Sequence, residues 1–209
     1  MTRILLADDH AVVRKGLRQI VKESVRGPVF GEASSGEEVL RKVSDEEWDI
    51  VILDISLPDQ SGLDVLKALR QTHPRLPVLV LSMHPEEQFA VRALKAGARG
   101  YVTKRTAARD LVAAVKKVLA GGRYLSASLA ERLAVNLQEN GVTPHERLSD
   151  REYQVFRMLA LGKTVKEISR ELGLSPQTVS THRARILEKM GMATNTELTQ
   201  YAIQNRILE

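Results

Sequence analysis

The chain has 209 residues, of which 43% are apolar, so it is long enough for one or two globular domains that each bury a core. It contains no cysteine, which excludes disulfide bonds, thiolate metal sites and cysteine nucleophiles. Lys and Arg exceed Asp and Glu by 31 − 26 = 5 charges, which is compatible with a nucleic-acid partner and equally with an ordinary solvated surface.

The sequence shows no sign of membrane insertion or export. The N-terminus runs into acidic residues without an apolar signal segment, and apolar runs such as residues 78–81 are far shorter than a membrane span. We therefore expect a soluble cytoplasmic protein with no membrane partner.

Residues 1–121 alternate short apolar runs with amphipathic stretches. The runs lack polar alternation, which is typical of parallel strands buried on both faces. The predicted strands are Ile4–Ala7, Val29–Ala33, Ile50–Asp54, Val78–Ser82 and Gly100–Thr103. The predicted crossover helices are Val12–Glu23, Gly36–Val43, Gly62–Gln71, Glu86–Ala96 and Ala107–Leu119. This pattern predicts an α/β domain with a doubly wound, five-stranded parallel sheet.

The pattern changes after Gly121-Gly122. A short helical stretch near residues 128–137 precedes a polar, turn-rich segment, so we expect residues 122–147 to be a linker with a short helix. Residues 148–209 show only helical periodicity, which predicts an all-α domain of four helices. The first opens at Ser149, and the others are Val165–Leu172, Pro176–Lys189 and Asn195–Asn205.

Three carboxylates stand at predicted strand ends. Asp8 and Asp9 end the first strand, and Asp54 ends the third. Because reactive groups gather at the carboxyl ends of the strands in such a sheet, we expect these side chains to lie together. Their mutual repulsion requires a counter-charge, and a hard cation such as Mg²⁺ suits an all-oxygen site.

A hydroxyl and an ammonium group are expected at the same edge. Ser82 ends the fourth strand and Lys104 follows the fifth. Either residue alone would more often be an ordinary surface residue. Together with the carboxylates they provide what a phosphoryl group requires, namely a nucleophile, a hydrogen-bond donor and positive charge.

These residues resemble the receiver domain of response regulators, which has the flavodoxin-like fold. The resemblance covers about residues 1–121. It is carried by Asp8-Asp9-His10, by Asp54 with Leu57-Pro58 and Gly62, by Ser82, and by Gly100-Tyr101-Val102-Thr103-Lys104.

The resemblance implies a signalling role rather than an enzymatic one. A sensor histidine kinase would pass a phosphoryl group from a phosphohistidine to Asp54, whose oxygens Lys104 would contact. Asp9, Asp54 and the Ser56 carbonyl would ligate Mg²⁺, with Asp8 acting through water. In the family's switch, the Ser82 hydroxyl moves toward the phosphate and the Tyr101 ring follows.

The rival hypothesis is an enzyme, a Mg²⁺-dependent phosphohydrolase that uses Asp54 as its nucleophile. Such enzymes resemble Asp-x-Asp, in which the second Asp protonates the leaving group. This chain has Ser56 at that position. We therefore expect the acyl phosphate to persist rather than to turn over rapidly.

The second half contains a helix-turn-helix pattern. Gly173 supplies the turn, and Ser175 followed by Pro176 is an N-cap with proline at the first helical position. The shared core is predicted to contain Ile168, Leu172, Leu174, Val179 and Ile186. A plain helical hairpin would explain this core equally well.

The outward face of the last of these helices favours DNA. Gln177, Ser180 and Thr181 are small or polar, so this face can enter a major groove and contact base edges. Arg185 on the flank is expected to contact phosphate. Residues 148–205 closely resemble the LuxR-type helix-turn-helix of the NarL/FixJ regulators. The resemblance implies promoter DNA and RNA polymerase as partners; a protein-binding helical output is the alternative.

The small size of this module also predicts a dimer. One short recognition helix covers few base pairs, so two copies on adjacent half-sites are needed for tight binding. We therefore expect phosphorylation to promote a homodimer, to uncover the recognition helix, or both.

Overall fold

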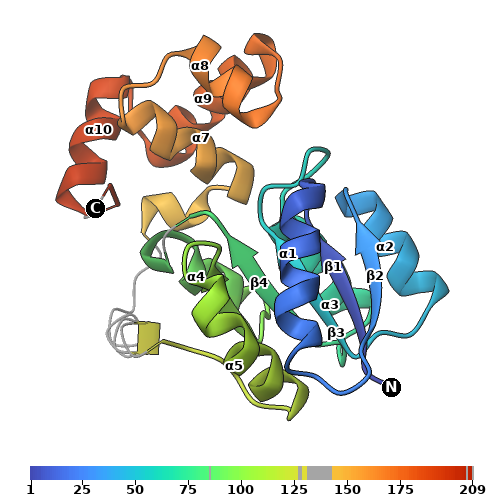
Figure 1. Ribbon diagram of the computed structural model, residues 1–209. Helices are drawn as coiled ribbons and strands as arrows, with labels where there is room; N and C mark the ends of the chain where they lie inside the picture. The colour runs from blue at the N-terminus through green and yellow to red at the C-terminus, as the bar shows by residue number, and fades with distance from the viewer. Residues whose placement is uncertain (85, 127–128, 131–142, 206, 209) are drawn as a thin grey trace. The chain divides into compact units, whose positions relative to one another are not determined.

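The first half of the chain is built on a parallel β-sheet whose strands are connected through helices (Figure 1). The computed structural model describes residues 1–209 except 85, 127–128, 131–142, 206 and 209. Within the described residues, the sheet has five strands in the order β2-β1-β3-β4-β5. They are β1 (Arg3–Ala7), β2 (Val29–Ala33), β3 (Ile50–Asp54), β4 (Val78–Ser82) and β5 (Gly100–Thr103). The predicted doubly wound sheet is confirmed.

Helices cover both faces of this sheet. They are α1 (Ala11–Lys22), α2 (Gly36–Asp45), α3 (Gly62–Thr72), α4 (Glu86–Lys95) and α5 (Ala107–Leu119). Helices α1 and α5 pack on one face, and α2 and α3 lie against each other on the other face (Figure 1). The predicted boundaries of α5 match the structure, and those of the other four helices differ from it by at most two residues, as is normal where helix ends fray.

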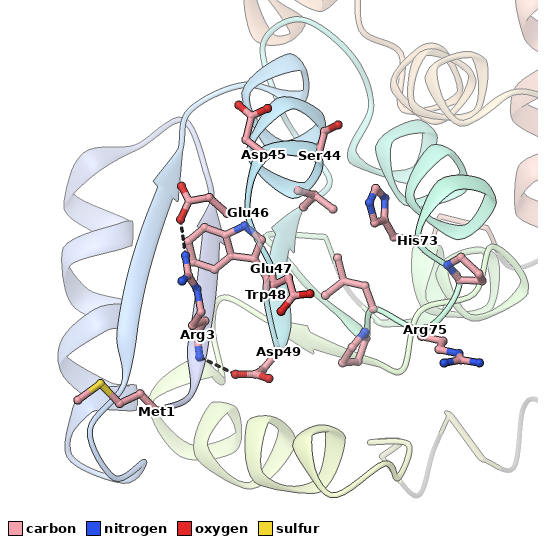
Figure 2. A pocket seen from close by; sticks show the side chains of 14 residues that line it. Met1, Arg3, Ser44, Asp45, Glu46, Glu47, Trp48, Asp49, His73 and Arg75 are labelled. Atoms are coloured by element: carbon pink, nitrogen blue, oxygen red, sulfur yellow. Dashed lines mark hydrogen bonds and ion pairs between the residues drawn. The ribbon is translucent and has the colours of Figure 1, made fainter.

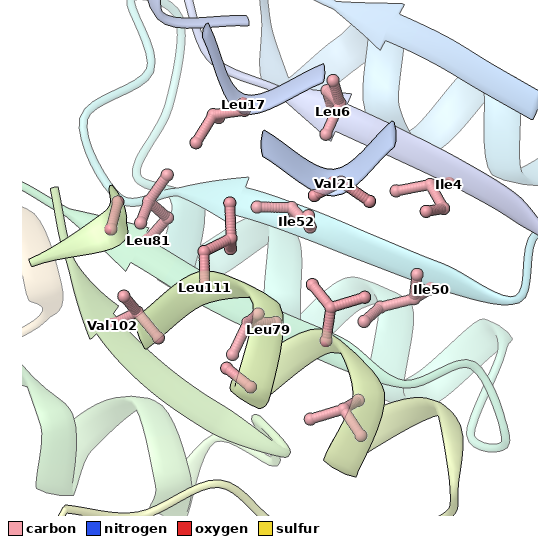
Figure 3. Close-up of a cluster of buried hydrophobic side chains, with 14 residues drawn as sticks. Ile4, Leu6, Leu17, Val21, Ile50, Ile52, Leu79, Leu81, Val102 and Leu111 are labelled. Atoms are coloured by element: carbon pink, nitrogen blue, oxygen red, sulfur yellow. The ribbon is translucent and has the colours of Figure 1, made fainter. Parts of the chain in front are cut away.

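The apolar runs become the core. Every residue of β3 and β4 is buried, which explains why these strands show no polar alternation in the sequence. Figure 3 shows the cluster between the sheet and α1 and α5, in which Leu6, Val21, Ile52 and Leu111 meet. Burying one such side chain contributes about 1.5–3 kcal/mol.

The sheet register brings the strand ends together. Asp54, the last residue of β3, pairs with Leu81, and Ser82 at the end of β4 pairs with Thr103. All strands run in parallel, so the segments that follow β1, β3, β4 and β5 leave the sheet at one edge.

The chain divides into two compact units, residues 1–138 and 139–209. The short helix predicted near residues 128–137 lies, apart from Leu129 and Ala130, outside the described residues. Part of the predicted linker packs on the first unit, because Tyr124 forms a parallel bridge with Gly100 of β5.

The second unit is helical. Its described elements are a 3₁₀ helix (Pro144–Arg147), α7 (Asp150–Ala160), α8 (Val165–Leu172), α9 (Pro176–Met190) and α10 (Asn195–Gln204). Its core contains Phe156, Ile168, Val179 and Ile186, all with 0% exposure, while Leu172 and Leu174 are half-buried. The predicted four-helix domain is confirmed. Over the described residues, no helix is both long and apolar enough to cross a membrane.

Candidate functional site

Two buried carboxylates lie at the carboxyl edge of the sheet. Asp8 follows β1 and Asp54 ends β3, and their side chains are each 2% exposed. Asp9, beside Asp8, has a partly exposed side chain. The backbone after Asp54 turns back sharply, since Gly62 N–H donates to the Ile55 carbonyl (2.8 Å). A Cβ at Gly62 would lie 2.0 Å from the Asp54 carbonyl oxygen, so this close approach requires glycine.

Lys104 joins the two carboxylates. Its Nζ lies 2.6 Å from Asp8 Oδ2 and 2.7 Å from Asp54 Oδ2. Its backbone N–H donates to the Ser82 carbonyl (2.7 Å), which holds this residue against the end of β4. The sequence predicted these residues at one edge, and the structure brings them into direct contact.

Burial and charge shift the pKa values in this cluster. Burial raises the pKa of Asp54 above its ordinary value, and the ion pair with Lys104 offsets only part of that effect. Burial opposes the charge of Lys104, yet Asp54 and Asp8 raise the pKa of its ammonium group above the ordinary value. Lys104 therefore stays cationic beside the carboxylates.

The cluster fits a divalent cation. Asp8 and Asp54 share the one ammonium group of Lys104, and Asp54 Oδ1 is buried without a hydrogen-bond partner among the described residues. Asp8, Asp9 and His10 place ligand atoms within 4.8 Å of one another. Ser56, whose carbonyl is the remaining predicted ligand, is exposed two residues beyond Asp54. Oxygen ligands of this kind match Mg²⁺.

A second candidate site is the outer face of α9. Gln177, Ser180, Thr181 and Arg185 are exposed there, whereas Val179, Ile186 and Met190 are buried on the opposite side. The Ser180 and Thr181 hydroxyls donate to backbone carbonyls one turn earlier, at 2.9 and 3.0 Å. Both hydroxyl oxygens keep acceptor capacity, and each can rotate to donate outward.

Two family models match the chain. One, described as the response regulator receiver domain, matches residues 4–116, and the other, described as the bacterial regulatory proteins of the luxR family, matches residues 146–202. The chain is similar to response regulator GacA of Pseudomonas viridiflava, with 36% identity over 211 residues covering 100% of this chain and 99% of GacA. It is 34% identical over 207 residues to response regulator UvrY of Escherichia coli K12, covering 98% and 95%.

The chain belongs to the NarL/FixJ family of response regulators. It is a two-component response regulator with a LuxR-type DNA-binding domain. Among solved structures, it is similar to RcsB of Salmonella enterica serovar Typhimurium bound to a promoter in the presence of the phosphomimetic BeF3⁻. The TM-score is 0.60 with 25% identity, covering 96% of this chain and 97% of RcsB.

The predicted switch residues of this response regulator lie inside the receiver. Ser82 is fully buried, and its Oγ accepts a hydrogen bond from the His84 N–H (3.1 Å). Tyr101 is 2% exposed, and its hydroxyl donates to the His84 carbonyl (2.9 Å). Both residues therefore contact the same loop residue between β4 and α4.

His10 joins the acidic cluster of the receiver. The sequence interpretation gave this residue no role of its own, but its Nδ1 lies 2.6 Å from Asp9 Oδ1 and its N–H donates to Asp8 Oδ1 (2.9 Å). Its position directly after the two acids was the signal in the sequence. The imidazole is 69% exposed, so it stands at the rim of the cluster.

Helix α9 of the response regulator is held by side chains that the sequence did not single out. Lys189 Nζ lies 2.6 Å from a carboxylate oxygen of the buried Glu152 in α7. Arg151 donates to the Leu172 carbonyl at the end of α8 (2.9 Å). Arg183 is half-buried and donates to Asn195 of α10 (2.7 Å). These contacts fix the orientation of α9 within the second unit.

A separate pocket of about 900 Å³ lies at the opposite end of the receiver sheet (Figure 2). The Arg3 guanidinium lies over the Trp48 ring in this pocket, with 5.1 Å between its central carbon and the ring centroid. The backbone N–H of Arg3 donates to the Asp49 carboxylate (2.7 Å). Because Arg3 begins β1 and Asp49 precedes β3, the pocket lies at the amino ends of the strands. It does not include Asp54.

Proposed function

We propose that Asp54 accepts a phosphoryl group from a phosphohistidine of a sensor histidine kinase, and that this modification controls homodimerisation and promoter binding by the second unit. The observation that carries the proposal is the position of Asp54. It is buried, contacts Lys104 through one carboxylate oxygen, and presents the other without a hydrogen-bond partner in the described part of the chain.

The chemistry is a phosphoryl transfer between a nitrogen and an oxygen. An electron pair of the Asp54 carboxylate forms the O–P bond while the P–N bond of the phosphohistidine breaks, and that bond's electron pair returns to the imidazole. Lys104, 2.7 Å from Asp54, can contact the transferred phosphoryl oxygens, and the Ser82 hydroxyl is the proposed second donor.

Mg²⁺ is the proposed cofactor. Asp9, Asp54 and the Ser56 carbonyl are the direct ligands in this proposal, and Asp8 acts through water. When bound, Mg²⁺ supplies positive charge that neutralises the carboxylates and the phosphoryl oxygens.

The alternative, a phosphohydrolase, is disfavoured by position 56. A serine hydroxyl is a poor proton donor compared with the second acid that rapid turnover requires. The relatives GacA and UvrY are named as response regulators.

The proposed division of the chain is a receiver at residues 1–121, a linker at 122–147 and a DNA-binding domain at 148–209. In the DNA-binding domain, Gln177, Ser180 and Thr181 contact bases and Arg185 contacts phosphate. The exposed outer face of α9 supports this assignment over a protein-binding output. RcsB, which is similar over nearly its whole length, has been solved on DNA and as dimers bound to DNA. RNA polymerase is the proposed downstream partner.

The test is phosphate uptake measured by intact mass. With acetyl phosphate and Mg²⁺, the parent protein gains one phosphoryl group and the Asp54→Asn variant gains none. Asp64→Asn removes a half-exposed carboxylate on α3 and is the matched control that should behave as the parent. Uptake by Asp54→Asn equal to the parent's contradicts the assignment, and rapid continuous phosphate release by the parent favours the phosphohydrolase.

A further inference from the structure

The residue that begins α1 does not cap this helix. His10 is the N-cap of α1, but its side chain forms no capping hydrogen bond. Short oxygen-bearing side chains are preferred at this position because they accept a backbone N–H of the first turn, as Ser35 does for α2 and Ser61 for α3. The imidazole of His10 is therefore available for another contact.

The imidazole turns back to the preceding carboxylate. His10 Nδ1 lies 2.6 Å from Asp9 Oδ1 and 3.5 Å from Asp8 Oδ1. An ionised carboxylate only accepts hydrogen bonds, so Nδ1 carries the hydrogen and Asp9 is the nearer acceptor. Hydrogen bonds to an ionised acceptor are about twice as strong as neutral ones. The bond uses one oxygen of Asp9, and the other oxygen can serve a cation.

The backbone on both sides of Asp9 is fixed by other bonds. The Asp8 N–H donates to the Ala33 carbonyl at the end of β2 (3.1 Å), and Arg14 donates to the Asp8 carbonyl (2.6 Å). The His10 N–H donates to Asp8 Oδ1 (2.9 Å). Because these bonds hold the loop, the rotation of the Asp9 side chain is what remains to be set.

The three carboxylates of the acidic cluster are held in different ways. Lys104 Nζ holds Asp8 and Asp54, at 2.6 and 2.7 Å. The Asp9 side chain is 33% exposed, and within the described part of the chain its carboxylate has one polar contact, which is the His10 ring. The orientation of the Asp9 carboxylate therefore depends on His10.

We infer that His10 positions the Asp9 carboxylate for Mg²⁺. The inference rests on the proposed function, in which Asp9 is a direct ligand. An unrestrained aspartate rotates about its side-chain bonds and must stop rotating to bind a cation, whereas a carboxylate that His10 already holds loses less freedom. Mg²⁺ prefers oxygen ligands, so the imidazole acts through Asp9 and does not bind the metal itself.

The first test measures the Mg²⁺ affinity of the full chain from the backbone amide shifts of residues 8–10 during titration with magnesium chloride. Removing the partner of a metal ligand typically lowers metal affinity about 10–100-fold, and the His10 ring is 69% exposed, so we expect His10→Ala to bind Mg²⁺ about tenfold more weakly than the parent. The matched control is Val12→Ala, in the first turn of α1 at a position 84% exposed, which should bind Mg²⁺ as the parent does.

The variant should fold as the parent does, because the His10 ring is exposed and caps no helix end. Urea unfolding without Mg²⁺, followed through Trp48 fluorescence, should therefore give the same midpoint for His10→Ala and the parent.

Two further measurements separate positioning of Asp9 from a general disturbance of the site. The phosphomimetic beryllofluoride should bind His10→Ala more weakly than the parent at low Mg²⁺ and equally tightly at saturating Mg²⁺, because only the metal step is affected. The nitrogen-15 shifts of the His10 ring in the parent should show the hydrogen on Nδ1 both with and without Mg²⁺, since the ring keeps its bond to Asp9.

The outcomes separate this inference from the proposed function. Mg²⁺ binding by the parent, with equal or tighter binding by His10→Ala, overturns the inference and leaves the proposed function standing. Beryllofluoride binding that stays weak at saturating Mg²⁺ also overturns it, as does loss of the Nδ1 hydrogen on adding Mg²⁺, which would identify the ring as a direct ligand. A parent whose amides at residues 8–10 do not respond to Mg²⁺ overturns both the inference and the proposed cofactor.

Discussion

The ion pair between Glu152 and Lys189 is expected to stabilise the DNA-binding unit. Glu152 is 3% exposed, accepts the Ser149 N–H (2.8 Å) as part of a capping box, and lies 2.6 Å from Lys189 Nζ. Replacing it by Gln keeps an oxygen for the cap and removes the charge. A charged hydrogen bond contributes about 1.5–3 kcal/mol, and Lys189 is 41% exposed, so we expect Glu152→Gln to cost about 1.5 kcal/mol.

The pH dependence follows from the pKa of Glu152. Burial alone would raise this pKa, but the bonds from Lys189 and from the Ser149 amide outweigh burial and hold the pKa below its usual value of 4.5. A carboxyl group with a lowered pKa stabilises the folded state above the unfolded pKa and loses that contribution as the pH falls through the folded one. The difference between parent and Glu152→Gln should be constant near neutral pH and vanish in acid.

The assay uses two optical signals from the full chain during urea unfolding. Trp48 is the only tryptophan and lies in the first unit, so its fluorescence reports the receiver alone. Far-ultraviolet circular dichroism reports the helices of both units. The dichroism transition of the second unit should shift while the fluorescence midpoint stays unchanged.

The matched control is Glu171→Gln, which breaks the exposed pair with Lys163 and should cost less than about 1 kcal/mol. An equal loss in Glu152→Gln and Glu171→Gln would refute the argument from burial. A loss in Glu152→Gln that persists in acid would refute the argument from charge.

Two further predictions concern the two candidate sites. Gly62→Ala places a Cβ 2.0 Å from the Asp54 carbonyl oxygen and should destabilise the receiver by about 3 kcal/mol, measured by unfolding followed through Trp48 fluorescence. The control Gly16→Ala, whose Cβ would have nothing within 4 Å, should leave the stability unchanged. Equal stabilities of the two variants would contradict the steric argument. Thr181→Ala should change the preference for particular bases at particular positions by about 1–3 kcal/mol. Arg185→Ala should weaken binding to all DNA sequences alike and reduce the slope of log affinity against log salt concentration by about one. The same uniform loss of affinity for both variants in binding-site selection would contradict this division.

The sheet could be predicted from the sequence because its local signals agree with the final fold. The predicted ends of all five strands match the structure, and at or directly after each end the apolar run gives way to a polar residue. The helix-turn-helix could be predicted for the same reason, since left-handed Gly173 ends α8 and the Ser175 cap begins α9, and both signals lie within the turn itself.

Contacts between distant residues could not be predicted in the same way. Lys189 and Glu152 are 37 positions apart in the chain, and no local sequence feature of either residue predicts that they pair. The return of Tyr124 to β5 reads in the sequence as linker, because a single bridge leaves no periodic pattern. Three-dimensional packing decides these contacts.

The same distinction holds within the acidic site. The sequence placed Asp8, Asp54 and Lys104 at one edge because strand ends converge. It did not show that Lys104 contacts both carboxylates, because that depends on the direction of one flexible side chain.

We propose that phosphorylation of Asp54 controls DNA binding by the second unit. The measurement is a DNA titration of the full chain, phosphorylated and unphosphorylated, with the mass of each species determined in solution. The DNA is a sequence selected from a random library by the phosphorylated protein. We expect phosphorylation to increase affinity at least about tenfold and to convert monomer to dimer. Equal affinity and equal mass in both states would contradict control of DNA binding by Asp54.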